Sequence, residues 1–109
     1  MLRGVYSRLR GKVAVVRGAS AENGSGWVIA EALAAEGAKV VVGARSAVPL
    51  HELATRIAGH AVVCDSGNIA HTDGLAREAV AAFGPIDIAV NAAAHTTFGL
   101  IADTPPEEL

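Results

Sequence analysis

Residues 11–26 read GKVAVVRGASAENGSG, a short apolar run followed by a glycine-rich segment. The run over residues 12–16 is rich in β-branched valines and bounded by glycines, which is typical of a strand buried on both faces. Behind the glycines, apolar residues recur at helical spacing from Trp27 to Ala34, and Gly37 follows where a helix would end. The segment therefore predicts a strand, a glycine loop and a helix.

The same alternation continues outward along the chain. Further strands are predicted over residues 39–42, 61–64 and 86–90, and helices over 46–57 and 75–83. On the last helix, four residues are expected to face the core: Leu75, Ala79, Ala82 and Phe83. Strands that alternate with helices form right-handed βαβ units and a parallel sheet. We therefore predict an α/β fold, a Rossmann-like doubly wound parallel sheet of order β-α-β-α-β-α-β with helices on both faces, truncated after the fourth strand.

Residues 1–10 are predicted to be a flexible N-terminal segment, because termini are commonly disordered. Residues 11–109 are predicted to form a partial dinucleotide-binding domain of the Rossmann type.

The amino-acid composition limits the classes of binding partner and the cellular location that we predict. Charged residues make up 18% and the net charge is −2, so neither nucleic acid nor an anionic membrane is predicted as a partner. No apolar run approaches the roughly 20 residues that span a bilayer. The single cysteine, Cys64, excludes an internal disulfide and agrees with a cytoplasmic location. The four histidines are too scattered to predict a metal site.

The glycine loop is suited to a phosphate group. A tight strand-to-helix turn needs the permissive φ of glycine, and a pyrophosphate must approach the backbone without a Cβ in the way. The helix N-terminus then offers unpaired N–H groups and a partial positive charge. The predicted contacts are Gly18, Ser20, Gly24, Ser25 and Gly26. The alternative is a glycine-rich turn that binds nothing.

The stretches GKVAVVRGAS, GSGWVIAEALAAEGAKVVVGARS, CD and GPIDIAVNAAA together resemble the short-chain dehydrogenase/reductase family from its first strand to its fourth. The loop of that family is usually Thr-Gly-x-x-x-Gly-x-Gly. Gly18, Gly24 and Gly26 match its glycines, whereas Arg17 replaces the Thr and two extra residues separate the first two glycines. The resemblance implies an NAD(P)-dependent oxidoreductase that transfers hydride between the cofactor and a carbonyl or alcohol.

The end of the second strand indicates which dinucleotide is bound. An acid there hydrogen-bonds the ribose diol, whereas an Arg accommodates a 2′-phosphate. Ala44 occupies the place of the acid, Arg45 follows it, and Ser46 adds a hydroxyl donor. NADP(H) is therefore favoured over NAD(H). The alternative is a solvated Arg at the start of a helix.

Two later segments take cofactor roles from the resemblance. Asp65 corresponds to the family Asp that accepts from the adenine amino group; the equally weighted alternative is a turn or N-cap Asp. Asn91 and Ala92 open the counterpart of the family motif Asn-Asn-Ala-Gly, here followed by two more alanines. In the family this stretch braces the sheet and lines the cofactor cleft.

The catalytic residues of the family have no counterpart in these 109 residues. The family uses a Tyr with a Lys four residues later, but the only tyrosine is Tyr6 and the only lysines are Lys12 and Lys39. No catalytic residue is therefore predicted, and a carbonyl or alcohol substrate is expected only if a missing half completes the chain. The alternatives are a non-catalytic nucleotide-binding fragment or a degraded gene product. A fourth strand left at the sheet edge predicts self-association.

Overall fold

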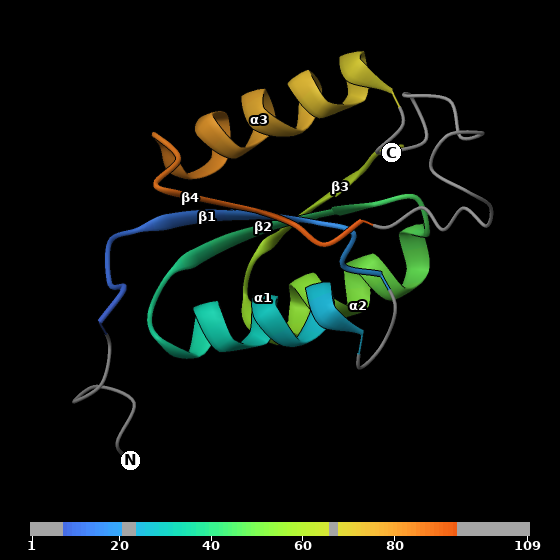
Figure 1. The fold of residues 1–109 in the computed structure, drawn as a ribbon. Coiled ribbons are helices and arrows are strands. Elements are labelled where there is room, and N and C mark those ends of the chain that lie inside the picture. Colours follow the sequence, from blue (N-terminus) through green and yellow to red (C-terminus); the bar gives the residue numbers. More distant parts are fainter. Residues whose placement is uncertain (1–7, 21–23, 66–67, 94–109) are drawn as a thin grey trace, which may run out of the picture.

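The computed structural model describes residues 8–20, 24–65 and 68–93 (Figure 1). Its elements are, in chain order, β1 (Val13–Arg17), α1 (Ser25–Ala35), β2 (Lys39–Ala44), α2 (Ala47–Ile57), β3 (His60–Val63), α3 (Ile69–Phe83) and β4 (Ile88–Asn91). The predicted order β-α-β-α-β-α-β is confirmed. All four strands lie within two residues of the predicted ranges.

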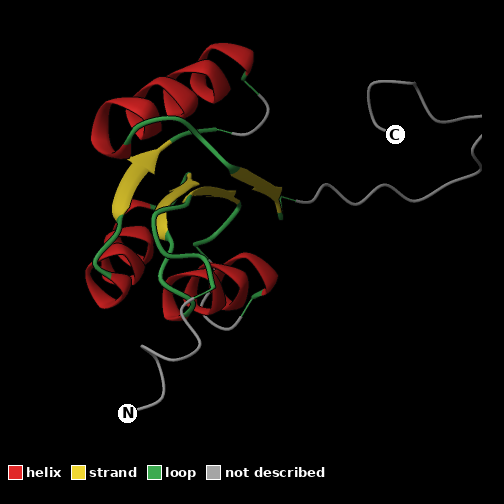
Figure 2. Cartoon of the chain, turned by 90° about the vertical axis from the view of Figure 1, so that its left-hand side faces the viewer, coloured by secondary structure: helices red, strands yellow, loops and turns green. Residues whose placement is uncertain are grey.

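The strands form one parallel sheet in the order β3-β2-β1-β4. In the register, Val15 of β1 pairs with Val41 of β2 and with Ala89 of β4. Helices α1 and α2 cover one face of the sheet and α3 covers the other, so the sheet is doubly wound (Figures 1 and 2). Among the described strands, β4 is paired on one side only, with β1.

Alternating valines of β1 and β2 supply both cores, because successive strand residues point to opposite faces. The core under α1 and α2 includes Val16, Trp27 and Leu50, all of which are almost fully buried. Trp27 is 2% exposed, and the guanidinium of Arg56 lies 5.6 Å from the centre of its ring. The core under α3 consists of Val15, Val41, Val62, Cys64, Leu75 and Ala79.

Helix α3 begins at Ile69, six residues before the predicted start at residue 75. Asn68 caps the helix, since its side-chain oxygen accepts a hydrogen bond from the N–H of His71 at 3.2 Å. The prediction that Ala82 points inward is also wrong, because Ala82 is exposed and the larger Phe83 packs against the core.

The chain before β1 is attached to the end of α1. Residues 8–10 form a turn in which the N–H of Leu9 donates to the carbonyl of Glu36 at 2.9 Å, and Leu9 packs against the core. The packed domain therefore includes Leu9, which lies within the segment predicted to be flexible. Residues 1–7 of that segment lie outside the described residues. In the part of the chain that the structure describes, no helix is long and apolar enough to cross a membrane.

Candidate functional site

The carboxyl ends of the parallel strands meet at one edge of the sheet, and the predicted site residues lie there. After β1 the chain turns into the glycine loop, where the N–H of Gly18 donates to the carbonyl of Gly43 in β2 at 2.7 Å. The sheet order reverses between β1 and β4, because β2 lies on one side of β1 and β4 on the other. In open α/β sheets this point of reversal is where ligands bind.

Gly18 and Gly26 are in direct backbone contact. A Cβ added to Gly26 would collide with the Gly18 carbonyl oxygen and lie 2.9 Å from its carbon. A Cβ added to Gly18 would lie 2.7 Å from the carbonyl carbon of Ala92. Gly18 also has a φ of +84°, which side-chain-bearing residues rarely adopt. The first glycine thus lies between the start of α1 and the end of β4.

Helix α1 begins directly after the glycine loop. Gly24 is its N-cap residue, no side chain among the described residues caps the helix, and the first turn holds no acidic residue. Ser25 is exposed and Ser20 is half-buried. The residues that lengthen the loop lie between Gly18 and Gly24, and residues 21–23 of that stretch lie outside the described residues. The first turn of α1, which holds no acidic residue, suits an anion because the helix dipole is positive there.

The end of β2 carries the residues predicted to discriminate between the two dinucleotides. Ala44 is the last residue of the strand and is 7% exposed, whereas Arg45 and Ser46 are exposed. Ser46 is the N-cap residue of α2, yet its side chain makes no capping hydrogen bond. A guanidinium and a hydroxyl therefore stand at the same sheet edge as the glycine loop.

The turn after β3 contains Asp65. Its N–H donates to Nδ1 of His71 at 3.0 Å, and its carbonyl accepts from the N–H of Asn68 at 3.0 Å. The N-cap of α3 is Asn68 and not Asp65. Beside it, Cys64 is 3% exposed; burial raises the pKa of its thiol, and the positive charge of Arg17 opposes that rise only in part. The thiol is thus held in its neutral form, which does not suit a nucleophile.

Asn91 ends β4 and organises the backbone that follows it. Its side-chain oxygen accepts from Nε of Arg17 at 3.3 Å and from the N–H of Ala93 at 3.2 Å. The N–H of Ala92 donates to the carbonyl of Arg17 at 2.8 Å. The guanidinium of Arg17 also donates to the hydroxyl of Thr72 in α3 at 2.9 Å. Sequence reasoning missed Thr72, because a threonine 55 residues away on a helix carries no local signal.

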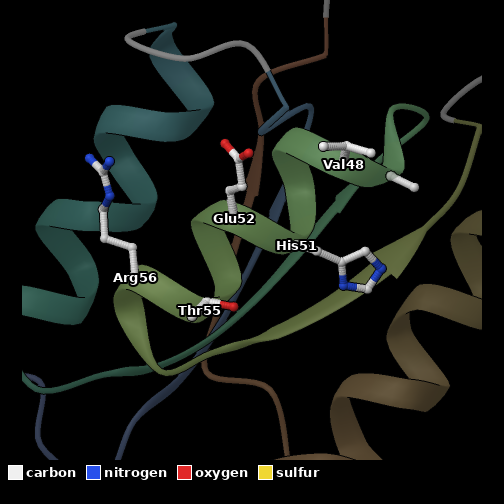
Figure 3. A pocket seen from close by; sticks show the side chains of 6 residues that line it. Val48, His51, Glu52, Thr55 and Arg56 are labelled. Atoms are coloured by element: carbon white, nitrogen blue, oxygen red, sulfur yellow. The ribbon is translucent and has the colours of Figure 1, made fainter.

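A separate groove of about 580 Å³ lies on the outer face of α2 (Figure 3). Val48, His51, Glu52 and Arg56 line it. In Figure 3 the Arg56 side chain leans toward α1 while His51 points the other way, so the polar groups do not converge on one point. This groove lies on an exposed helix surface and not among the strand ends.

A parallel doubly wound sheet with a glycine loop after its first strand defines the class of Rossmann-like dinucleotide-binding folds. A family model described as enoyl-(acyl carrier protein) reductase matches residues 18–109. The chain belongs to the short-chain dehydrogenase/reductase family. It is 40% identical over 107 residues to the short chain dehydrogenase/reductase nsrJ of Aspergillus novofumigatus, and the match covers 93% of this chain and 40% of that protein.

Solved structures give the same result. A short chain dehydrogenase from Mycobacterium smegmatis superposes with a TM-score of 0.79 at 31% identity, over 94% of this chain and 44% of that one. The F189W actinorhodin polyketide ketoreductase with NADPH superposes with a TM-score of 0.75 at 29% identity, over 89% of this chain and 38% of that one. The chain therefore spans about two fifths of the length of these relatives.

Proposed function

We propose that this chain is the NADP(H)-binding part of an oxidoreductase of the short-chain dehydrogenase/reductase family. The observation that carries the proposal is the close packing of Gly18 on Gly26 at the start of α1. This arrangement brings bare backbone and a positive helix end to the point where the sheet order reverses. It is the geometry that a pyrophosphate requires.

Each predicted residue then has a role in holding the dinucleotide. The glycine loop, with Ser20 and Ser25, would bind the pyrophosphate through backbone N–H and hydroxyl groups. Arg45 and Ser46 would bind the 2′-phosphate, and Asp65 the adenine. Asn91 and Ala92 would form the wall of the cleft at the end of β4. When bound, the nicotinamide donates or accepts the hydride. The actinorhodin ketoreductase, one of the structural neighbours, was solved with NADPH.

Proton transfer to or from a substrate needs a group that this sequence does not supply. Tyr6 is followed four residues later by Arg10, and neither Lys12 nor Lys39 stands four residues after a tyrosine. Reduction of a carbonyl or oxidation of an alcohol would therefore require residues outside these 109.

We expect the 109-residue chain to bind NADPH and to leave a panel of ketones unreduced. Binding is measured by titration calorimetry, and turnover by the loss of nicotinamide absorbance against a buffer blank. A Gly26→Val variant is the control, because its side chain would occupy the space of the Gly18 carbonyl. Absence of NADPH binding by a folded wild-type chain would refute the proposal. Turnover that Gly26→Val abolishes would show that the chain is itself catalytic.

We also propose that the 109-residue chain self-associates in solution. Among the described strands β4 has an unpaired edge, and its Ala89 is exposed. An apolar strand with an open edge readily pairs with another chain. Size-exclusion chromatography with light scattering should show species larger than the 11.0 kDa monomer. An Ala89→Lys variant should shift the distribution toward monomer, and a wild-type chain that elutes only as monomer would contradict the expectation.

A further inference from the structure

Arg17 joins three elements that lie far apart in the sequence. It is the last residue of β1 and immediately precedes the first glycine of the loop. Its side chain lies on the α3 side of the sheet, where Nη1 donates to the Thr72 hydroxyl at 2.9 Å and Nε donates to the Asn91 side-chain oxygen at 3.3 Å. These partners are 55 and 74 residues away along the chain.

The main chain and the side chain of Arg17 both hold the backbone that follows β4. Through its main chain, the Arg17 carbonyl accepts from the N–H of Ala92 at 2.8 Å. Through its side chain, Arg17 fixes the Asn91 oxygen that accepts from the N–H of Ala93 at 3.2 Å. Residues 92–93 supply the atoms that lie against Gly18, where an added Cβ would have no room. The position of Arg17 thus sets how closely the end of β4 approaches the glycine loop.

The Thr72 contact anchors the guanidinium from the opposite side. The Thr72 hydroxyl donates its own proton to the carbonyl of Asn68 at 3.3 Å, which leaves its oxygen free to accept from Arg17. Arg17, Thr72 and Asn91 share the lining of a cavity of about 270 Å³ with apolar residues such as Leu75 and Ala89. A partly apolar setting strengthens hydrogen bonds from a charged donor.

The shape of the arginine side chain suits this double contact. Guanidinium presents its donors in a rigid planar fork, so Nε and Nη1 reach two acceptors at once. A lysine would bring the same charge as a single point on a flexible stem. The threonine usual in this family at this position is too short to reach both partners.

We infer that Arg17 is a positioning residue of the cofactor cleft, which holds Asn91 and residues 92–93 against Gly18 while anchored on Thr72 of α3. Neither hydrogen-bond partner of its side chain lies at the end of β2, where Arg45 and Ser46 stand. The inference that Arg17 shapes a cofactor cleft rests on the proposed function. Its loss should weaken contacts at the end of β4 and leave binding at the end of β2 intact.

The test compares Arg17→Met and Arg17→Lys with the wild-type chain in two measurements. Hydrogen exchange of the Ala93 N–H, followed by NMR without cofactor, should be roughly tenfold faster in both variants, since a charge-assisted bond is lost. Affinity for NADPH should fall roughly tenfold, whereas affinity for adenosine 2′,5′-bisphosphate, which lacks the nicotinamide half, should stay unchanged. Rescue by Arg17→Lys would show that charge alone suffices and would overturn the inference.

A Thr72→Val variant removes only the anchor, so it remains informative if Arg17→Met does not fold. It should change both measurements in the same direction by a smaller factor, and Thr55→Val, on the exposed face of α2, should change neither. Unaltered exchange of the Ala93 N–H in the Arg17 and Thr72 variants would refute the inference that Arg17 holds residues 92–93. If the wild type binds no NADPH, the proposed function fails, and the exchange rates still decide whether Arg17 holds residues 92–93.

Discussion

A Gly18→Ala variant is expected to lose a large part of its free energy of unfolding. The φ of +84° costs a residue with a Cβ about 1–2 kcal/mol. The new methyl group would also lie 2.7 Å from the Ala92 carbonyl carbon, and overpacking of this kind costs about 1–3 kcal/mol more. The three atoms nearest to the new methyl group all belong to the backbone of residues 92–93, so no flexible side chain can move away. The combined loss is comparable with the whole stability of a small domain, about 5 kcal/mol at the low end.

Gly11 provides a matched control for this substitution. Its φ is +83°, nearly that of Gly18, but nothing lies within 4 Å of an added Cβ. Gly11→Ala should therefore show the conformational cost without the collision. Gly74→Ala, in the middle of α3 with open space around it, should stabilise the chain by about 0.5–1 kcal/mol. Urea denaturation followed by circular dichroism measures all three. Equal stabilities of the Gly18 and Gly11 variants would show that residues 92–93 do not pack as described.

An Arg45→Ala variant is expected to lose about ten- to a hundredfold in affinity for NADPH and almost nothing for NADH. The difference arises because Arg45 is exposed just after β2 and would pair with the 2′-phosphate, which NADH lacks. A charge-assisted hydrogen bond contributes about 1.5–3 kcal/mol, which corresponds to that range. Titration calorimetry with both dinucleotides gives the ratio directly.

Arg77→Ala is the control for the loss of one positive charge. Arg77 is also exposed, but it lies on α3 away from the end of β2. Its removal should weaken both dinucleotides equally and slightly, and more salt should diminish even that effect. A wild-type chain that binds NADPH and NADH with equal affinity would rule out Arg45 as the residue that selects the 2′-phosphate.

The parallel sheet was predictable because its information is local. Valine-rich runs bounded by glycines, with helices at 3.6-residue spacing between them, specify the order of elements without any long-range contact. The tight turn between β1 and α1 was predictable for the same reason, since the glycines that signal it belong to one loop. The start of α3 was missed because Asn68 acts as a cap through a side-chain bond to His71, and the same residue also favours turns.

The hydrogen bonds from Arg17 to Thr72 and Asn91 were not predictable from the sequence. Arg17 was visible as a departure from the family threonine, but the direction of its side chain depends on Thr72 and Asn91, which only the folded sheet brings near. No prediction was made from Gly43, because the second predicted strand ended at residue 42, whereas β2 continues to Ala44. In the structure a Cβ on Gly43 would lie 2.9 Å from the Leu75 side chain.

The buried Trp27 is an intrinsic fluorescent probe of this chain. Trp27 is the only tryptophan, and its indole is enclosed one residue after the last glycine of the loop, beneath the guanidinium of Arg56. Its Nε1 has no hydrogen-bond partner among the described residues, so the ring lies in an apolar environment. The wavelength of its emission maximum therefore depends on whether water reaches the first turn of α1. A single unlabelled emission band thus follows both the unfolding of the chain and any ligand-induced movement at this helix start.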